Sequence, residues 1–374
     1  MRKVAVIFGG KSCENEISVL TGVFVMNVID REKYTIIPVY IHTDGMAYTS
    51  PTMTNLDTFK QKNYRDFVRV IFDGGYVYAF QGEKKRLKRL AKIDVALNCC
   101  HGGLGEGGGV SALMEWNDIP LASPDLTASG VFMDKCMTKL LMRGLGVPTV
   151  DYLRASESDY KKRGAFLLKR IAGRLKYPVV VKPAHLGSSI GIALANNEAE
   201  AKAAIENAFL LDDQVMIEKY LAKKQDVNCA ACQVKGEIYV SEPEAAFGAG
   251  IYSFEEKYVK RKADAAAQSG KSGGRVAIKG EIRDKIRAYT RTVYKRMNLR
   301  GVVRLDFLVC ERDVYLCEVN TVPGSLAYYL FCERIVDARA FFSDVLEEAV
   351  RSHAESKKTL VSTGILRSIS WQTK

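Results

Sequence analysis

Long apolar runs are missing from this 374-residue sequence. No run reaches the roughly 18 residues that a transmembrane helix needs, so a membrane-spanning protein is not expected. The chain opens with MRKVAVIFGG, where the apolar run covers only 4–9 and ends in glycines, so we expect a strand there and not a signal peptide. The sequence also has no internal repeat and no GxxxxGK[ST] spacing, which excludes a Walker A phosphate loop.

Paired metal-binding cysteines are also missing, although the chain has nine cysteines. Cys229 and Cys232 have CxxC spacing, but there is no second such pair and no histidine nearby, so we expect neither metal nor redox chemistry there. The count is odd, and most of the cysteines lie within apolar runs. This pattern indicates buried free thiols in a reducing cytoplasm.

Acidic residues are outnumbered, because 55 Lys and Arg stand against 43 Asp and Glu, for a net charge of +12. Nucleic-acid binding is the obvious alternative for such a chain. The basic residues are scattered, however, and the densest clusters lie at 84–89 and 257–262. We expect the first cluster to be a solvated helix face. A phosphate-rich small ligand explains local basic groups, so no nucleic-acid partner is predicted.

Strand-like and helix-like segments alternate along the chain, which is typical of an α/β protein with ligand groups at the carboxyl ends of parallel strands. Helices are expected at 16–29, 125–145, 199–211, 281–297 and 334–354. Strands are expected at 3–8, 39–41, 93–98, 178–183, 214–220 and 227–234, with a hairpin around Asp73-Gly74-Gly75. The stretch 244–275 has no periodicity, which is typical of a functional lid or loop.

Residues 304–325, RLDFLVCERDVYLCEVNTVPGS, have the pattern of a β-hairpin that turns at Glu311-Arg312-Asp313. Asp306 lies on the first strand, and Glu318 and Asn320 lie two apart on the second, so their side chains share a face. Such oxygen ligands suit Mg²⁺ bound together with nucleotide phosphates. The segment alone is equally compatible with an ordinary solvated hairpin.

Three further segments carry polar groups at the ends of expected strands. HGGLGEGG, at 101–108, offers backbone amides to a ligand, although His101 alone is more typical of a structural histidine. Lys182 followed by the small residues 187–189 is able to cover a polyphosphate, with Lys135 as a second cation. The strand 216–221 surrounds Glu218 and is able to offer backbone hydrogen bonds to a base, or it is simply an edge strand.

As a set, these segments resemble the D-alanine–D-alanine ligase family of the ATP-grasp fold, from about residue 3 to about residue 350. The resemblance rests on HGGLGE (101–106), MDK (133–135), PVVVKPAHLGSSIG (178–191), IEKYL (217–221), EEKY (255–258), RLDF (304–307) and EVNTVPG (318–324). It implies a Rossmann-like, parallel-sheet N-terminal domain (1–123). Two α+β domains that sandwich ATP (124–217 and 218–352) and a tail (353–374) would follow.

The resemblance also implies a reaction in which ATP phosphorylates the carboxylate of one D-alanine, and the amine of a second displaces the phosphate. In this family pattern, Glu16 would hold the first ammonium and His101 would approach its carboxylate. Ser188 and Tyr258 would bond with Glu16 and close the 244–275 loop, which would exclude water. Arg304 and the Gly324 amide would stabilise the oxyanion.

The nucleotide and metal roles follow from the same resemblance. ATP would be bound by Lys135, Lys182, Ser189, Glu218, Lys219, Leu221, Asp226 and Lys257. A pair of Mg²⁺ ions, or Mn²⁺ in their place, would be bound by Asp306, Glu318 and Asn320. The product would serve peptidoglycan synthesis in the cytoplasm, and family members are commonly homodimers.

Three departures from the family pattern concern the ribose contact, the turn after Glu106 and the second substrate. Asp226 stands where a Glu usually contacts the ribose, and Gly107 replaces an Asp. Tyr329 and Leu330 stand where a Ser and a Leu usually contact the second substrate. D-serine, D-lactate or another amino acid is therefore an alternative acceptor. A non-catalytic nucleotide-binding or nucleic-acid-binding protein on the same scaffold is the alternative from a different class, although the intact set of phosphate, oxyanion and metal residues argues against it.

Overall fold

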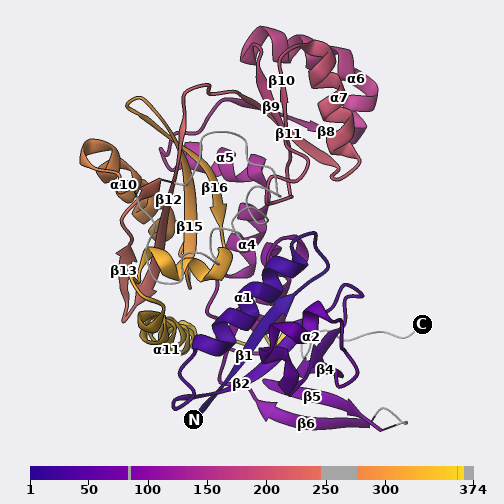
Figure 1. Ribbon diagram of the computed structural model, residues 1–374, viewed down its shortest axis with the longest axis vertical. Helices are drawn as coiled ribbons and strands as arrows, with labels where there is room; N and C mark the ends of the chain where they lie inside the picture. The colour runs from indigo at the N-terminus through magenta and orange to yellow at the C-terminus, as the bar shows by residue number, and fades with distance from the viewer. Residues whose placement is uncertain (83–85, 246–275, 360, 366–374) are drawn as a thin grey trace.

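The computed structural model describes residues 1–82, 86–245, 276–359 and 361–365. Three sheets organise these residues into an N-terminal, a central and a C-terminal lobe (Figure 1). Within these ranges, none of the helices combines the length and the apolar character needed to cross a membrane. The α/β class predicted from the sequence is confirmed.

The N-terminal sheet is parallel only at one end, where β7 (Val95–Asn98) is the edge strand. β1 (Arg2–Gly9) pairs in parallel with β2 (Tyr34–Ile41) and with β7. The strands beyond β2 pair antiparallel, in the order β6-β5-β4-β3-β2, so the expectation of a parallel sheet is correct for three of its seven strands. These strands beyond β2 are β3 (Ala47–Thr49), β4 (Val68–Asp73), β5 (Tyr76–Gln81) and β6 (Arg86–Lys92).

The basic segment from Arg86 onward is an exposed edge strand, β6, and the helix expected there was wrong. The segment forms a strand and not a helix because it pairs with β5, where Arg86 lies opposite Gln81. The predicted hairpin at Gly74-Gly75 is confirmed by β4 and β5. The helical elements of this lobe are α1 (Asn15–Val28), η1 (Pro51–Thr54), α2 (Leu56–Lys60), η2 (Gly105–Gly109) and α3 (Val110–Trp116).

The turn between β1 and α1 requires glycine. Gly9 has φ +92°, and a Cβ atom there would lie 2.3 Å from the Ile41 carbonyl oxygen. This tight turn brings the chain from the carboxyl end of β1 directly into the loop that precedes α1. The loop therefore lies at the sheet edge where ligand groups of parallel strands gather.

The central lobe is an antiparallel sheet with the order β10-β9-β11-β8. Its helices α6 and α7 lie together on one side of the sheet (Figure 1). The single helix expected over 125–145 is divided into α4 and α5, because extended backbone at Asp134 ends the first helix and the Asp134 carboxylate caps the second. The bounds are α4 (Leu126–Met133), α5 (Lys135–Gly144), β8 (Tyr152–Ser156), α6 (Glu157–Arg170), η3 (Ile171–Leu175), β9 (Val179–Pro183), β10 (Ala193–Ala195), α7 (Glu198–Phe209) and β11 (Gln214–Lys219).

The C-terminal lobe contains the site hairpin within a five-stranded antiparallel sheet. One hydrophobic core joins this lobe to the N-terminal lobe, since Phe8, Met26, Leu326 and Phe342 belong to the same buried cluster. The bounds are β12 (Gln225–Val234), β13 (Glu237–Val240), β14 (Glu244–Ala245), α10 (Gly280–Arg296), β15 (Val303–Cys310), β16 (Asp313–Asn320), η4 (Gly324–Leu330), η5 (Ile335–Asp337) and α11 (Ala338–Ser356).

Candidate functional site

The hairpin of β15 and β16 places four polar side chains on one face. Arg304 pairs with Asn320 across the strands, and Asp306 pairs with Glu318. Directly opposed residues of an antiparallel pair point to the same side, as do residues two apart on one strand. A bulge after Asp306 shifts the register, so Cys317 is the extra residue on β16.

These side chains are tightly connected. Arg304 donates from Nε and from a terminal nitrogen to Asp306, at 2.7 and 2.8 Å. The Asn320 amide donates to Asp306 at 3.0 Å, and a second terminal nitrogen of Arg304 donates to the Tyr329 hydroxyl at 3.3 Å. The guanidinium thus links the candidate metal ligands to the segment expected to meet the second substrate.

The oxygen atoms of the hairpin fit a hard divalent cation. Asp306 and Glu318 are directly opposed carboxylates, and Arg304 offsets the charge of Asp306. Asn320 adds an amide oxygen on the same face. Two carboxylates with an amide oxygen form a ligand set that suits Mg²⁺, which otherwise keeps water and phosphate oxygens.

A buried cluster of two lysines and one glutamate lies between the central sheet and α5. Lys182 of β9 contacts Glu218 of β11 at 2.5 Å, and Lys139 of α5 donates to the other carboxylate oxygen and to the Val150 carbonyl at 3.0 Å. Burial acts to raise the pKa of Glu218, but Lys182 and Lys139 lower it to about 2. Because the Glu218 carboxylate is held by lysines here, adenine recognition would rely on the neighbouring backbone.

Lys139 was missed in the sequence analysis. It lies four residues after Lys135, hence on the same face of one helix, and this spacing was the available signal. Lys135 itself is buried and donates to the Leu186 carbonyl at the start of the glycine-serine loop. Two helical lysines therefore approach the loop and the strand that were assigned to phosphate binding.

The glycine-serine loop contacts Glu14 of the N-terminal lobe and not Glu16. The Ser188 hydroxyl donates to the Glu14 carboxylate, and a Cβ at Gly187 would lie only 2.6 Å from a Glu14 oxygen. Glu14 is 7% exposed, whereas Glu16 is exposed on α1. The expected contact of Ser188 with Glu16 was therefore wrong. Because α1 begins at Asn15, the residue just before it faces the site and the residue just inside it faces solvent.

His101 is 5% exposed and connects the lobes through hydrogen bonds. Its Nε2 lies 2.8 Å from the Thr21 hydroxyl, which also accepts the Ser325 amide at 3.2 Å. Burial lowers the pKa of His101 to about 4, against a hydrogen bond to the Val322 backbone that raises it. His101 is therefore neutral near pH 7.

The segment after the hairpin has unusual backbone. Ser325, Leu326 and Ala327 follow Gly324 with φ of 50°, 51° and 47°, the left-handed region that non-glycine residues rarely adopt. Leu326 and Ala327 are buried in the core shared by the lobes. This turn presents Tyr329 toward Arg304, while Leu330 is 8% exposed.

The other predicted site residues do not take part in the contacts described above. Asp226 pairs with Lys224 at 2.6 Å, Lys219 is exposed, and Leu221 and Ser189 are half-buried. Lys257 and Tyr258 lie outside the described residues, so their expected roles stay predictions.

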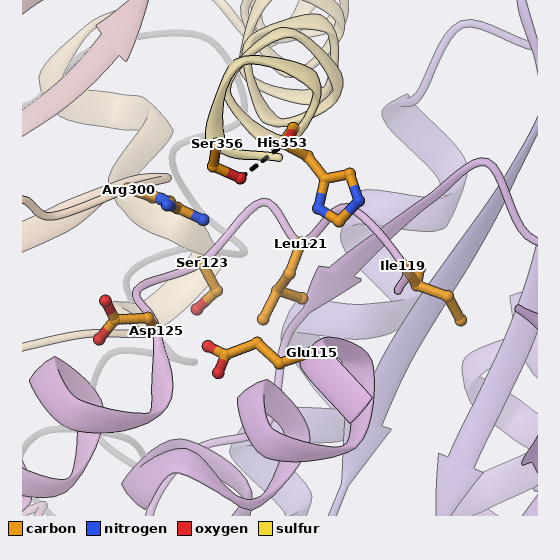
Figure 2. Close-up of a pocket in the computed structure, with 8 residues that line it drawn as sticks. All are labelled: Glu115, Ile119, Leu121, Ser123, Asp125, Arg300, His353 and Ser356. Atoms are coloured by element: carbon orange, nitrogen blue, oxygen red, sulfur yellow. Dashed lines mark hydrogen bonds between the residues drawn. The ribbon is translucent and has the colours of Figure 1, made fainter. Parts of the chain in front are cut away.

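A separate cavity of about 160 Å³ lies away from all of the predicted site residues (Figure 2). Several of its polar groups already have partners. Glu115 accepts the Leu126 amide at 3.1 Å, the His353 ring lies 2.9 Å from Asp118, and the Ser356 hydroxyl donates to the His353 carbonyl. The cavity therefore belongs to the junction of α3, the segment 119–125 and α11. The hairpin face is the stronger candidate for an active site.

Comparisons with known proteins agree with this geometry. A family model described as "D-ala D-ala ligase N-terminus" matches residues 3–124, and one described as "D-ala D-ala ligase C-terminus" matches residues 141–351. The chain is 32% identical to the D-alanine–D-alanine ligase of Thermosipho africanus over 88% of each chain.

Two solved structures share the fold at lower identity. The VanG D-Ala:D-Ser ligase of Enterococcus faecalis has a TM-score of 0.73 at 24% identity, over 94% of this chain and 99% of that one. The D-alanine–D-alanine ligase of Bacillus anthracis complexed with ATP has a TM-score of 0.63 at 21% identity, over 96% of this chain and 100% of that one. The ATP-grasp fold expected from the sequence is thereby confirmed, and the chain belongs to the D-alanine–D-alanine ligase family.

Proposed function

We propose that this chain joins two D-alanines into D-alanyl-D-alanine, using ATP and forming ADP and phosphate, to supply peptidoglycan synthesis. The observation that carries the proposal is the convergence of Arg304, Asp306, Glu318 and Asn320 on one hairpin face, with Lys182 on the adjoining sheet. A protein that only binds a nucleotide would need the lysines, but it would not also need an arginine and a carboxylate pair placed for phosphoryl transfer.

ATP is the proposed phosphoryl donor. Lys135, Lys182 and the loop at Ser188-Ser189 would hold its phosphates, and the backbone at Lys219 and Leu221 would meet adenine. This assignment is supported by the burial of both cations beside the loop and by the relative that was solved with ATP. Asp226 would contact the ribose once its pairing with Lys224 is exchanged.

Mg²⁺ would be held by Asp306, Glu318 and Asn320, and it would offset the charge of the phosphates. Arg304 would then stabilise the oxyanion that develops when the second amine attacks, together with the Gly324 amide. Lys257 and Tyr258 lie outside the described residues, and their proposed roles are those that the resemblance implies.

The first D-alanine would lie between Glu14 and His101. The Glu14 carboxylate, oriented by Ser188, would hold its ammonium group. Neutral His101 offers a polar ring without a competing charge near the carboxylate that is to be phosphorylated. Phosphorylation converts a poor leaving group into phosphate, and the second amine then forms the peptide bond.

D-serine is the second candidate for the acceptor. The Tyr329 hydroxyl, which accepts from Arg304, places a polar group in the acceptor segment where the family usually has Ser. A structural neighbour, VanG, is a D-Ala:D-Ser ligase. Because Ser also carries a hydroxyl, it is the larger phenol of Tyr329 that changes the acceptor segment and makes a different acceptor a candidate.

A cytoplasmic homodimer is the proposed form. All nine cysteines are free thiols, which fits a reducing compartment. Trp116 is 91% exposed and Leu113 is 38% exposed on α3, an apolar face that a second copy would cover. Sedimentation of the protein beside Trp116→Glu tests this, since a monomer in both would contradict it.

The deciding experiment supplies ATP, Mg²⁺ and D-alanine, measures phosphate release, and identifies the product by mass. D-serine, D-lactate and L-alanine are offered as competing acceptors. D-alanyl-D-alanine as the main product is the expected result. Release of phosphate only with D-serine would instead establish the second candidate, and no release with any acceptor would refute both.

A further inference from the structure

His185 lies between two carboxylates at the base of the glycine-serine loop. Its Nδ1 is 2.9 Å from Asp212, and its Nε2 is 3.6 Å from Asp134. The backbone amide of His185 also donates to Asp212, at 2.7 Å. One side chain therefore bridges the segment just before β11 to the boundary between α4 and α5.

Both partners are fixed by other hydrogen bonds. The Asp134 carboxylate accepts the amides of Cys136 and Met137 at 2.7 and 3.0 Å, and so caps α5. Asp212 also accepts the Gln214 amide at 3.1 Å. The two carboxylates are 12% and 5% exposed as side chains, so the pair is largely shielded from water.

The contacts of His185 with Asp134 and Asp212 lie next to Lys135 and the glycine-serine loop, which are both assigned to the ATP phosphates. Lys135 follows Asp134, its backbone amide donates to the Ala184 carbonyl at 3.1 Å, and its ammonium donates to the Leu186 carbonyl. His185 is the residue between these two carbonyl groups. Its side chain thus fixes, from the opposite side, the stretch of backbone that Lys135 contacts.

We propose that His185 is a positioning residue, whose imidazolium clamps the start of the glycine-serine loop against α5 so that Lys135 and Ser188 are held ready for the ATP phosphates. This inference rests on the ATP site of the proposed function. The clamp acts at the boundary between the central sheet and the helix pair α4–α5, so it also fixes the position of that sheet relative to Lys135 and Lys139 of α5.

A divalent cation is the competing occupant, because ligand atoms of His185, Asp212 and Asp213 lie within 4.8 Å of one another. Both Asp212 oxygens already accept N–H groups, however, and the ring contacts carboxylates at both nitrogens. A ring that meets a carboxylate at each nitrogen is best satisfied as a double donor, which is the imidazolium.

The charged groups around the ring also favour the imidazolium form of His185. Asp134 and Asp212 raise the pKa of His185 to about 10, against burial, which lowers it. Asp213 is close on the same side, while Arg154 lies 4.0 Å from Asp134 and Lys135 follows it in the chain. The ring therefore stays charged at neutral pH.

The test compares ligand binding by the full chain and by His185→Gln, using calorimetry with a non-hydrolysable ATP analogue and with adenosine. A neutral amide reaches only one carboxylate, so the loop is held less firmly and binding of the analogue should weaken about tenfold. Binding of adenosine should be unchanged, because it has no phosphate and the adenine contacts are remote from the clamp. Equal weakening of both ligands, or of neither, overturns the inference.

Two further measurements keep the result interpretable. His42→Gln is the matched control, because His42 also pairs with an aspartate, at 3.3 Å, but on the N-terminal sheet; loss of analogue binding in this control as well would contradict a specific role for His185. If His185→Gln folds poorly, His185→Ala with added imidazole replaces it, and recovery of analogue binding supports the clamp, whereas no recovery overturns it.

Inhibition of the wild type by Zn²⁺ that is absent in His185→Gln would favour the cation site instead. Failure of the proposed function looks different: the wild type would bind the analogue and release no phosphate.

Discussion

Replacing Glu218 by Gln tests the buried lysine–glutamate cluster. The Glu218 carboxylate is 2% exposed and holds Lys139 and Lys182. Its pKa, lowered from 4.5 to about 2 by the lysines against burial, corresponds to about 3 kcal/mol of stability. Removing one member of a buried ion pair costs about 3–5 kcal/mol, so the two estimates agree.

Urea unfolding followed by circular dichroism measures this difference. We expect Glu218→Gln to be about 3 kcal/mol less stable than the wild type near pH 7. Because the pKa is lowered in the folded state, the contribution is complete above pH 4.5 and is lost as the pH falls toward 2. The gap should therefore shrink by about 1 kcal/mol near pH 3.5.

Glu157→Gln is the matched control, since Glu157 also pairs with a lysine, Lys161, at 2.6 Å, but on an exposed helix face. Its loss should change stability by less than about 0.5 kcal/mol. The reasoning would be refuted if Glu218→Gln were as stable as this control near neutral pH. It would also fail if the gap between Glu218→Gln and the wild type stayed constant down to about pH 3.5.

Three other predictions concern the reaction, each measured as phosphate release. Glu14→Gln should lower kcat/KM for the first D-alanine by about tenfold or more, since a charged contact is lost, and Glu16→Gln should not; the reverse order would restore the original assignment. Asp306→Asn should raise the Mg²⁺ concentration needed for half-maximal rate about tenfold, and chelation should stop the wild type; an unchanged Mg²⁺ requirement would exclude Asp306 as a ligand. Tyr329→Ser should change the ratio of kcat/KM for D-alanine and D-serine as acceptors by about tenfold, and an unchanged ratio would remove Tyr329 from the acceptor site.

The site was predictable where its chemistry lies within one local element. Asp306, Glu318 and Asn320 belong to a single hairpin; the period of two along a strand places Glu318 and Asn320 on one face, and the pairing of the hairpin adds Asp306. The strand that carries Lys182 was likewise evident from its apolar run. A hairpin or a strand of this kind is determined by residues that are close in sequence, so the sequence pattern is enough to predict it.

The features that were predicted wrongly or overlooked depend on contacts between residues that are far apart in the sequence. The choice between Glu14 and Glu16 depends on where α1 begins, which is set by the turn at Gly9 against Ile41. The strand β6 exists because β5 offers an edge to it. His185 gave no signal, because its two carboxylate partners come from segments separated by about 80 residues and are joined only by the fold.

The left-handed turn at Ser325-Leu326-Ala327 restricts how this enzyme is able to evolve. Each of these residues adopts backbone that costs a non-glycine residue about 1 kcal/mol or more, and the turn persists because Leu326 and Ala327 are buried between the lobes. A substitution within the turn would therefore threaten the interface before it altered the pocket. New acceptor preferences are accordingly more accessible through the downstream side chain of Tyr329, whose replacement leaves the turn intact. Natural variation among close relatives should then concentrate after the turn and spare the turn itself.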